Sequence, residues 1–416
     1  MMKQKLIFAL LVVLNLLTIS SCKKSSTEEK PYVILISLDG FRWDYVDRFQ
    51  PPHLSNFIKG GIKAESLIPS FPSKTFPNHY TIATGMYPDK HNIIGNRFYS
   101  YEKDALYAIG DTITVEDGSF YKGTPIWVHA EQSKMISASY FFVGSEANIQ
   151  GMRPTYYKRY DDKIKNEVRI NKTIEWLQLP EKERPRLITL YFSDMDNAGH
   201  SFGPNNDEEL KKALFALDKQ LGVLFKRVEE TGLPVNIVFV SDHGMTEVPS
   251  DRYLSREAIK NDALYLTVDN GAIVNIYPKD ATQTDAIFQS LKAKENHFKV
   301  YKTENTPGFE YTPKNKNWGA VQLLPDFGYY FTSRQRVEAL GKQPIQPFGA
   351  HGFDPAQKDM HGILYANGPA FKEGYSFGSV KNIHIYPLVC KMLGLEIPTN
   401  IDGKLSEVEF VLKESE

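Results

Sequence analysis

The sequence is poor in cysteine and has no excess of charge of either sign. Its 416 residues include two cysteines, and 49 basic residues balance 50 acidic ones to a formal net charge of −1. If Cys22 is modified as described below, Cys390 has no partner, so stability has to come from the core and from any bound metal. The absence of a basic field argues against a nucleic acid polymer as the partner.

The N-terminus lacks an apolar run of the length of a membrane span. The run Leu6–Leu17 is shorter than the roughly 20 residues that a spanning helix needs. It leads into Ile19-Ser-Ser-Cys22, which resembles a bacterial lipobox, whose cysteine is lipid-modified and becomes the first residue of the mature protein. We expect a lipoprotein signal peptide over residues 1–21, a lipid anchor at Cys22 and a flexible tether over 22–30, with an ordinary cleaved signal as the alternative.

This leader predicts a location in the bacterial cell envelope, with the lipid anchor on the periplasmic or outer-membrane face. The anchor is then the expected contact with the membrane.

The remaining chain has the pattern of an α/β domain. Residues 32–37, 187–192 and 235–240 are continuous apolar runs typical of buried parallel strands. Between the last two, six apolar residues recur at helical spacing before Gly232: Leu210, Leu214, Leu217, Leu221, Leu224 and Val228. Strand, helix and strand in that order predict an α/β fold.

The domain is expected to span residues 31–416. Residues 246–350 are less regular, and we interpret them as an inserted smaller lobe within the catalytic domain. Residues 362–366 resemble a further strand.

Acidic residues follow each of the three predicted strands. Asp39 comes directly after residues 32–37, and the pair Asp242-His243 comes directly after residues 235–240. Asp196 follows shortly after residues 187–192, with His200 one helical turn further on. Because ligands bind at the carboxyl ends of strands in open parallel sheets, these residues are expected to meet at one edge.

With His351, these residues make six metal ligands around the hydroxyl of Thr75. Imidazole and carboxylate groups suit zinc, and six ligands suit two ions with three protein ligands each. A threonine hydroxyl is a weak nucleophile until a metal or base activates it. The set therefore predicts a hydrolase with two Zn²⁺ ions and Thr75 as its nucleophile.

Six segments carry a family resemblance. They are Ile36-Ser-Leu-Asp-Gly-Phe-Arg42, Lys74-Thr-Phe-Pro-Asn-His-Tyr80, Thr84-Gly-Met-Tyr-Pro-Asp-Lys-His-Asn-Ile-Ile-Gly-Asn96, Asp196-Asn-Ala-Gly-His-Ser-Phe-Gly-Pro204, Ser241-Asp-His-Gly-Met245 and His351-Gly-Phe-Asp354. In order and spacing they resemble the nucleotide pyrophosphatase/phosphodiesterase family of the alkaline phosphatase superfamily. The resemblance implies an alkaline-phosphatase-like, mostly parallel sheet between helix layers, and the chain resembles a minimal catalytic domain carried on a lipoprotein.

The resemblance also implies a role for each ligand. Asp39, Asp242 and His243 would hold the zinc that activates Thr75, and Asp196, His200 and His351 would hold the second zinc.

The resemblance implies further roles around the nucleophile. Thr75 would form a covalent phosphoryl ester, and Asn96 with the backbone amide of Phe76 would stabilise the charged phosphoryl oxygen. The rings of Phe76 and Tyr160 would stack on a nucleobase without selecting among bases. Lys74 would aid an anionic substrate, or be a solvated side chain. The implied reaction releases nucleoside 5′-monophosphates from nucleotide phosphodiesters or pyrophosphates.

Other histidines and other functions stay open. We expect His79 and His91 to make structural hydrogen bonds, and we favour His351 over His361 as the ligand. The alternative activities are a phosphomonoesterase, a phosphodiesterase of glycerophosphocholine type, and a surface lipoprotein that binds without catalysis. Phosphomonoesterases of the threonine type carry a Lys-x-Arg pair, whereas Lys158 and Arg159 are adjacent here.

Overall fold

The computed structural model describes residues 31–340 and 348–414. The predicted signal peptide, the anchor at Cys22 and the tether lie outside the described residues. Within the described ranges, no helix combines the length and the apolar character needed to cross a membrane.

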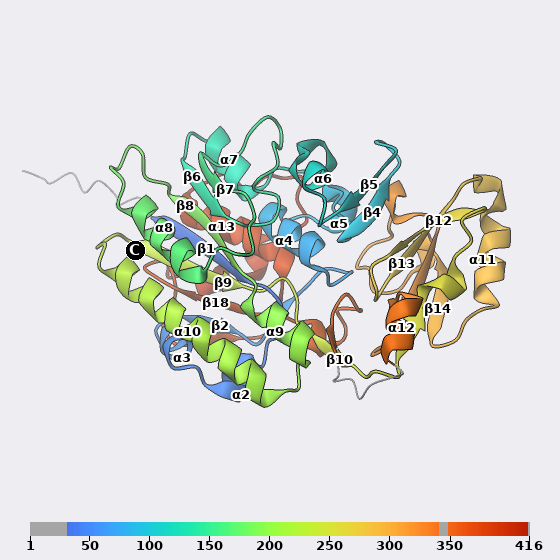
Figure 1. Ribbon diagram of the computed structural model, residues 1–416. Coiled ribbons are helices and arrows are strands. Elements are labelled where there is room, and N and C mark those ends of the chain that lie inside the picture. Colours follow the sequence, from blue (N-terminus) through green and yellow to red (C-terminus); the bar gives the residue numbers. More distant parts are fainter. Residues whose placement is uncertain (1–30, 341–347, 415–416) are drawn as a thin grey trace, which may run out of the picture. The chain divides into compact units, whose positions relative to one another are not determined.

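A mostly parallel sheet forms the centre of the domain, with helices on both faces (Figure 1). Within the described residues it has eight strands in the order β19-β2-β18-β9-β1-β8-β6-β7. The five strands from β9 to β7 run parallel, and β18 is antiparallel to both its neighbours. Their bounds are β1 (Tyr32–Leu38), β2 (Ile62–Ala64), β6 (Ser137–Tyr140), β7 (Tyr156–Lys158), β8 (Leu187–Phe192), β9 (Val235–Val240), β18 (Leu364–Asn367) and β19 (Tyr375–Phe377). The predicted α/β class and mostly parallel sheet are confirmed.

Strand β1 is buried along its whole length because helices cover both of its faces. Val33 and Leu35 belong to the core on one face, whereas Ile34 and Ile36 belong to the core on the other. The alternation follows from the two-residue period of a strand, and it explains why the sequence here is continuously apolar.

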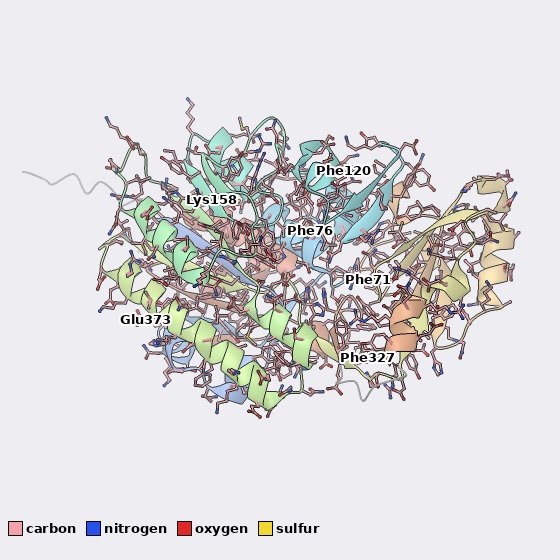
Figure 2. All side chains as sticks on the ribbon, in the orientation of Figure 1. Phe71, Phe76, Phe120, Lys158, Phe327 and Glu373 are labelled. Carbon is pink, nitrogen blue, oxygen red and sulfur yellow. The ribbon has the colours of Figure 1, made fainter. Side chains whose placement is uncertain are left out.

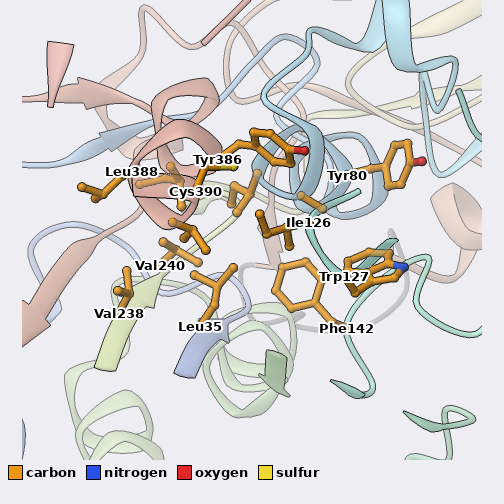
Figure 3. Packing of buried hydrophobic residues seen from close by; sticks show 14 of the residues in the cluster. Leu35, Tyr80, Ile126, Trp127, Phe142, Val238, Val240, Tyr386, Leu388 and Cys390 are labelled. Atoms are coloured by element: carbon orange, nitrogen blue, oxygen red, sulfur yellow. The ribbon is translucent and has the colours of Figure 1, made fainter. Parts of the chain in front are cut away.

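The first face is covered by helices that include α4 (Thr75–Thr84), α7 (Ile126–Gln132) and α13 (Ile385–Leu393). Figure 3 shows strand residues such as Leu35 and Val240 packed near Tyr386 and Cys390 of α13. Cys390 is fully buried, and burial raises the pKa of its thiol to about 12. Its environment is that of a structural apolar side chain rather than a reactive thiol.

The second face is covered by α2 (Tyr45–Phe49), α3 (Pro52–Lys59), α8 (Asn166–Leu177), α9 (Asp194–Phe202) and α10 (Asp207–Glu229). The six apolar residues predicted to line one face of a helix are all buried in α10. The helix begins after Asn206, whose side chain accepts a hydrogen bond from the amide of Glu209.

The lobe, residues 246–350, contains its own antiparallel sheet in its described part. Four strands lie in the order β12-β13-β15-β14 and enclose a separate apolar cluster with α11. The bounds are β12 (Tyr265–Asp269), β13 (Val274–Pro278), α11 (Thr284–Lys292), β14 (Phe298–Lys302) and β15 (Val321–Pro325), with β10 (Thr246–Val248), β11 (Tyr253–Ser255), β16 (Tyr330–Thr332), α12 (Arg334–Leu340) and β17 (Phe348–Ala350) around them.

Shorter elements complete the described fold. They are β3 (Leu67–Ile68), α5 (Pro88–His91), β4 (Arg97–Ser100), β5 (Ala105–Ala108), α6 (Thr112–Glu116) and β20 (Val380–Lys381). β4 and β5 pair in an antiparallel hairpin directly after Asn96.

The carboxylate of Asp218 holds two helices together. It lies on the buried face of α10 and accepts hydrogen bonds from the amides of His53 and Leu54, at 3.0 and 2.7 Å, in the first turn of α3. We expect Asp218→Ala to lower the free energy of unfolding by about 3 kcal/mol, because the buried amide of Leu54 and the partly buried amide of His53 lose their acceptor. Urea denaturation measures this change. Lys219→Ala, at the exposed neighbouring position, is the control and should shift stability by less than about 0.5 kcal/mol; equal effects of the two would contradict the capping role.

Candidate metal centre and active site

Three aspartates meet at the carboxyl ends of three adjacent strands. Asp39 follows β1 and Asp242 follows β9, while Asp196 lies in the first turn of α9, just after β8. Because β9, β1 and β8 are neighbours in the sheet, the strand order itself brings these carboxylates together. The prediction that they meet at one edge of the sheet is confirmed by the structure.

Gly40 allows this close approach. Its φ is +62°, and a Cβ atom there would lie 2.8 Å from the Cα of Asp196. A side chain would therefore push α9 away from the end of β1, and the left-handed backbone would add strain. The amide of Gly40 also donates to Oδ1 of Asp242 at 3.2 Å.

Three histidines face the aspartates with their Nε2 atoms. The Nδ1 atom of each lies within hydrogen-bond distance of a backbone carbonyl: His243 with Gly244 at 2.8 Å, His200 with Gly349 at 2.7 Å, and His351 with Ser73 at 2.9 Å. A carbonyl can only accept, so each Nδ1 carries a proton, and Nε2 is the ring nitrogen left to bind a metal. This is the arrangement of histidines that bind metals.

Three carboxylate oxygens complete the set. Within the described residues, Asp39 Oδ1, Asp196 Oδ1 and Asp242 Oδ2 are buried without a hydrogen-bond partner. Asp39 Oδ1 and Asp242 Oδ2 lie 3.4 and 3.1 Å from His243 Nε2, and Asp196 Oδ1 lies 3.4 Å from His200 Nε2. A buried, unpaired carboxylate oxygen is costly, and a divalent cation would satisfy it. The six residues thus fit a metal centre.

The two predicted triads are in contact with each other. The rings of His243 and His351 stack with centroids 3.5 Å apart, and His200 lies 5.2 Å from His351. Ligand atoms of Asp196, His243 and His351 lie within 4.8 Å of one another. A second such group joins Asp39 and Asp242 with His79. The structure therefore brings all six predicted ligands into one cluster, although these two groups do not coincide with the predicted triads.

The charges of this cluster conflict in the absence of a cation. Burial, and then the carboxylates of Asp242 and Asp196, raise the pKa of Asp39 well above its usual value. Burial acts in the same direction on Asp242, but His243 and His79 outweigh it and lower the pKa of Asp242 well below normal. Metal ions would remove the conflict by compensating both carboxylates.

Thr75 lies at the start of α4 beside this cluster. Its Oγ1 is 3.3 Å from Nε2 of His243, the histidine of the first triad. Asn96 is close by, but its contact with Phe76 differs from the one expected. The amide of Phe76, expected to face a phosphoryl oxygen, donates instead to Oδ1 of Asn96 at 3.0 Å. The pair therefore presents the side-chain nitrogen of Asn96 as its donor.

A pocket of about 230 Å³ opens at Thr75. Asp39 and Asp196 line its metal end, and Phe76, Tyr160 and Lys158 line the remainder, where Phe141 and Val115 add apolar surface. Phe76 and Lys158 are labelled in Figure 2. Tyr160 is half-exposed and lies 5.3 Å from the ring of Phe141. The two aromatic residues predicted to stack on a base thus line one pocket.

The other histidines of the motifs are engaged in structural contacts. His79 contacts the hydroxyl of Ser37 at 2.8 Å and the carbonyl of Thr75 at 2.9 Å, although its Nδ1 also lies 3.3 Å from Asp242. His91 contacts Thr81 and the amide of Ile93. His361 contacts Ser66 and the carbonyl of Pro355. Because both nitrogens of each ring have protein partners, His91 and His361 support the fold around the ligands. His79 makes structural contacts too, but it also lies close enough to Asp39 and Asp242 to form a possible metal-binding group with them.

Lys74 points away from the pocket and toward the lobe. Its ammonium donates to the hydroxyl of Tyr330 at 3.1 Å, and its side chain is 3% exposed. Burial lowers the pKa of Lys74 to about 8. The alternative prediction, that Lys74 is a solvated side chain, is therefore wrong.

Tyr191 is a residue of the site that the sequence did not reveal. Its hydroxyl donates to Asp39 Oδ2 at 2.6 Å, which turns Oδ1 toward His243. The sequence presents it as one more apolar residue of a buried strand. Tyr191 is the next-to-last residue of β8, and this position near the carboxyl end of the strand could have indicated that it lies close to the site.

Comparisons with known proteins agree on one family. The family model of type I phosphodiesterase / nucleotide pyrophosphatase matches residues 33–354. The chain is 32% identical over 375 residues to human bis(5'-adenosyl)-triphosphatase ENPP4, covering 89% of this chain and 80% of that protein. It is 33% identical over 399 residues to ectonucleotide pyrophosphatase/phosphodiesterase family member 1 of Mus musculus, covering 92% of this chain but 43% of that protein.

Solved structures show the same fold. An inactive threonine-to-alanine variant of murine ectonucleotide pyrophosphatase / phosphodiesterase 5 in complex with AMP superimposes with a TM-score of 0.83 at 28% identity, covering 92% of this chain and 100% of that one. The human protein of the same name gives a TM-score of 0.84. The chain therefore belongs to the type I phosphodiesterase / nucleotide pyrophosphatase family, enzymes that hydrolyse phosphodiester and pyrophosphate bonds.

Proposed function

We propose that this protein is a zinc-dependent hydrolase that releases nucleoside 5′-monophosphates through a phosphothreonine intermediate at Thr75. The observation that carries the proposal is the cluster of six ligands, with three histidines fixed at Nδ1 and three carboxylate oxygens unpaired, around the Thr75 hydroxyl. The donor set of imidazole and carboxylate is that of zinc.

Two zinc ions bound there would act as Lewis acids that lower the pKa of the Thr75 hydroxyl and polarise the phosphoryl group. Asp39, Asp242 and His243 would hold the ion next to Thr75, and Asp196, His200 and His351 would hold the other. Tyr191 fixes the orientation of Asp39 through its hydrogen bond to Oδ2.

Thr75 loses its hydroxyl proton to solvent and attacks the phosphorus atom with Oγ1. The bond from phosphorus to the leaving group breaks, the leaving group departs with its oxygen and takes up a proton from solvent, and the nucleoside 5′-phosphoryl group remains esterified to Thr75. Water then cleaves that ester and releases the nucleoside monophosphate. The start of α4 carries partial positive charge that favours the anionic ester. The side-chain nitrogen of Asn96 donates to the oxygen on which charge develops.

Phe76 and Tyr160 would hold the base of the released nucleotide. Both line the pocket that contains Thr75, and aromatic faces stack on any base. Two relatives support a nucleotide substrate: one is named for the hydrolysis of a dinucleoside triphosphate, and the other was solved with AMP. The inactive variant of the latter replaces a threonine by alanine, which supports a threonine nucleophile.

Thr75→Ala should lower kcat on a nucleotide aryl diester by at least about 1,000-fold, because no oxygen remains to attack phosphorus. Zinc bound per chain, measured by elemental analysis, should be unchanged, since Thr75 is not among the six ligands. Thr75→Ser keeps the hydroxyl and should retain measurable turnover. Unchanged activity in Thr75→Ala would remove Thr75 from the mechanism.

The wild-type protein should hydrolyse an aryl diester of a nucleoside 5′-monophosphate at least about tenfold faster than an aryl phosphate monoester. The diester places its base in the aromatic pocket, whereas the monoester gains nothing from Phe76 or Tyr160. The ratio of kcat/KM measures the preference, and a chelator should abolish both reactions. Faster monoester turnover would make the protein a phosphomonoesterase, and preference for glycerophosphocholine would make it a head-group diesterase.

We propose that a lipid at Cys22 anchors the enzyme in the cell envelope, on the support of the lipobox-like Ile19-Ser-Ser-Cys22. Cys22→Ser should move the enzyme from the membrane fraction to the soluble fraction, because acyl chains supply the membrane affinity. Immunoblots of the two fractions measure the shift. Cys390→Ser is the control and should leave the distribution unchanged; the same distribution for Cys22→Ser and the wild type would exclude the anchor.

A further inference from the structure

Asn270 of the lobe binds the backbone next to Asn96. It occupies the turn between β12 and β13 and is buried, with 8% of its surface exposed. Its Oδ1 accepts from the amide of Arg97 and its Nδ2 donates to the carbonyl of Arg97, both at 2.9 Å. We propose that Asn270 is a positioning residue that acts through Arg97 to aim the Asn96 side chain at the reacting phosphoryl group. This inference rests on the proposed role of Asn96.

The hydrogen bonds to Arg97 complete a set that fixes Asn96 from several sides. Oδ1 of Asn96 accepts from the amide of Phe76, and its carbonyl accepts from the amide of Ile109 at 3.1 Å. These contacts hold the tip of the side chain and one side of its backbone. Asn270 holds the following residue at both of its peptide groups, which leaves the backbone of Asn96 little rotational freedom.

Gly95, on the other side of Asn96, shows how tightly the lobe packs here. A Cβ atom at Gly95 would lie 3.3 Å from Nδ2 of Asn270 and 2.9 Å from the carbonyl oxygen of Arg97. The side chain of Asn270 therefore packs against the turn that carries Asn96, beyond its hydrogen bonds to Arg97.

The turn that carries Asn270 is itself held in place. The amide of Asn270 donates to the carbonyl of Ile273 at 3.0 Å, and the carbonyl of Gly271 accepts from the amide of Phe331 at 3.0 Å. Gly271 has a φ of +78°, and a Cβ atom there would lie 1.8 Å from the ring of Tyr330. The turn thus requires glycine at this position and packs directly on Tyr330.

Tyr330 extends the same contact to the nucleophile. Its hydroxyl accepts from the ammonium of Lys74 at 3.1 Å and lies 3.5 Å from the carbonyl of Asn270. Lys74 precedes Thr75, as Arg97 follows Asn96. The lobe therefore contacts the direct neighbours of both the attacking residue and the proposed transition-state donor.

A donor held in advance stabilises developing charge without reorganising during the reaction. Losing Asn270 would let the Asn96 donor move while leaving the pocket for the substrate intact. We therefore expect a lower kcat with an unchanged KM, since small displacements of catalytic groups affect the transition state most.

A double-mutant cycle on kcat tests this role, with bis(p-nitrophenyl) phosphate as the substrate and the zinc-loaded full chain as the enzyme. Asn96→Ala should lower kcat by about 100-fold. Asn270→Ala should lower it by about tenfold with KM within about twofold. The double variant should be no slower than Asn96→Ala alone, because Asn270 has no donor left to position.

Asn317 offers a matched control. It is also a buried asparagine of the lobe, accepts from the amide of Tyr101 at 3.1 Å and donates to Asn92 at 2.9 Å. Asn317→Ala removes comparable contacts away from Asn96 and should keep kcat within about twofold of the wild type. Asn270→Asp retains the acceptor for the Arg97 amide and should recover part of the kcat lost in Asn270→Ala, which also guards against misfolding of the alanine variant.

Three results would overturn the proposal. Effects of Asn96→Ala and Asn270→Ala that multiply in the double variant would show that Asn270 acts independently of Asn96. A loss in Asn270→Ala no larger than in Asn317→Ala would show only general destabilisation of the lobe. An unchanged kcat in Asn96→Ala would overturn both this inference and the proposed role of Asn96, whereas the first two results leave that role intact.

Discussion

The site depends on three buried carboxylate oxygens that have no hydrogen-bond partner among the described residues. Asp39, Asp196 and Asp242 deliver them at the ends of the adjacent strands β1, β8 and β9. An unpaired carboxylate in the interior costs several kcal/mol, and a divalent cation bound among the three oxygens would offset that cost. The parallel sheet makes this arrangement possible because strand ends converge while the helices behind them exclude water.

Backbone carbonyls from other parts of the chain orient the three histidines toward these carboxylates. Their partner carbonyls belong to Ser73, Gly244 and Gly349, which are far apart in the sequence. Each carbonyl fixes one imidazole with Nε2 directed inward. Ser73 lies two residues before Thr75, the first residue of α4, so the segment that orients His351 continues into the proposed nucleophile. The orientation of His351 and the position of the Thr75 hydroxyl are therefore set by the same backbone segment.

Much of this could be predicted from the sequence, because the relevant signals are local. The apolar runs predicted β8 and β9 to the residue, and the acidic residues after each run predicted the metal edge. Two contacts could not be predicted in this way: the hydrogen bond from Tyr191 to Asp39 and the hydrogen bonds between Asn270 and Arg97. Each joins residues that are far apart in the sequence, and the spacing of apolar residues along the chain carries no information about such contacts. The amide of Phe76 was expected to face a phosphoryl oxygen, but it donates to the side chain of Asn96, which lies 20 residues further along the chain.

The lobe is the region where sequence patterns carried least information, and its contacts explain why it matters to the site. Its four-stranded sheet has a core of its own, yet one turn and one tyrosine reach the neighbours of Thr75 and Asn96. A nucleophile and a hydrogen-bond donor on separate segments keep a constant distance only if both segments pack against the same rigid part of the protein. The ends of the central strands place the three carboxylates, whereas the lobe contacts the neighbours of Thr75 and Asn96 and also orients His200 through the carbonyl of Gly349. Drift of the turn at Asn270 would change the spacing of Thr75 and Asn96 without disturbing the six ligands.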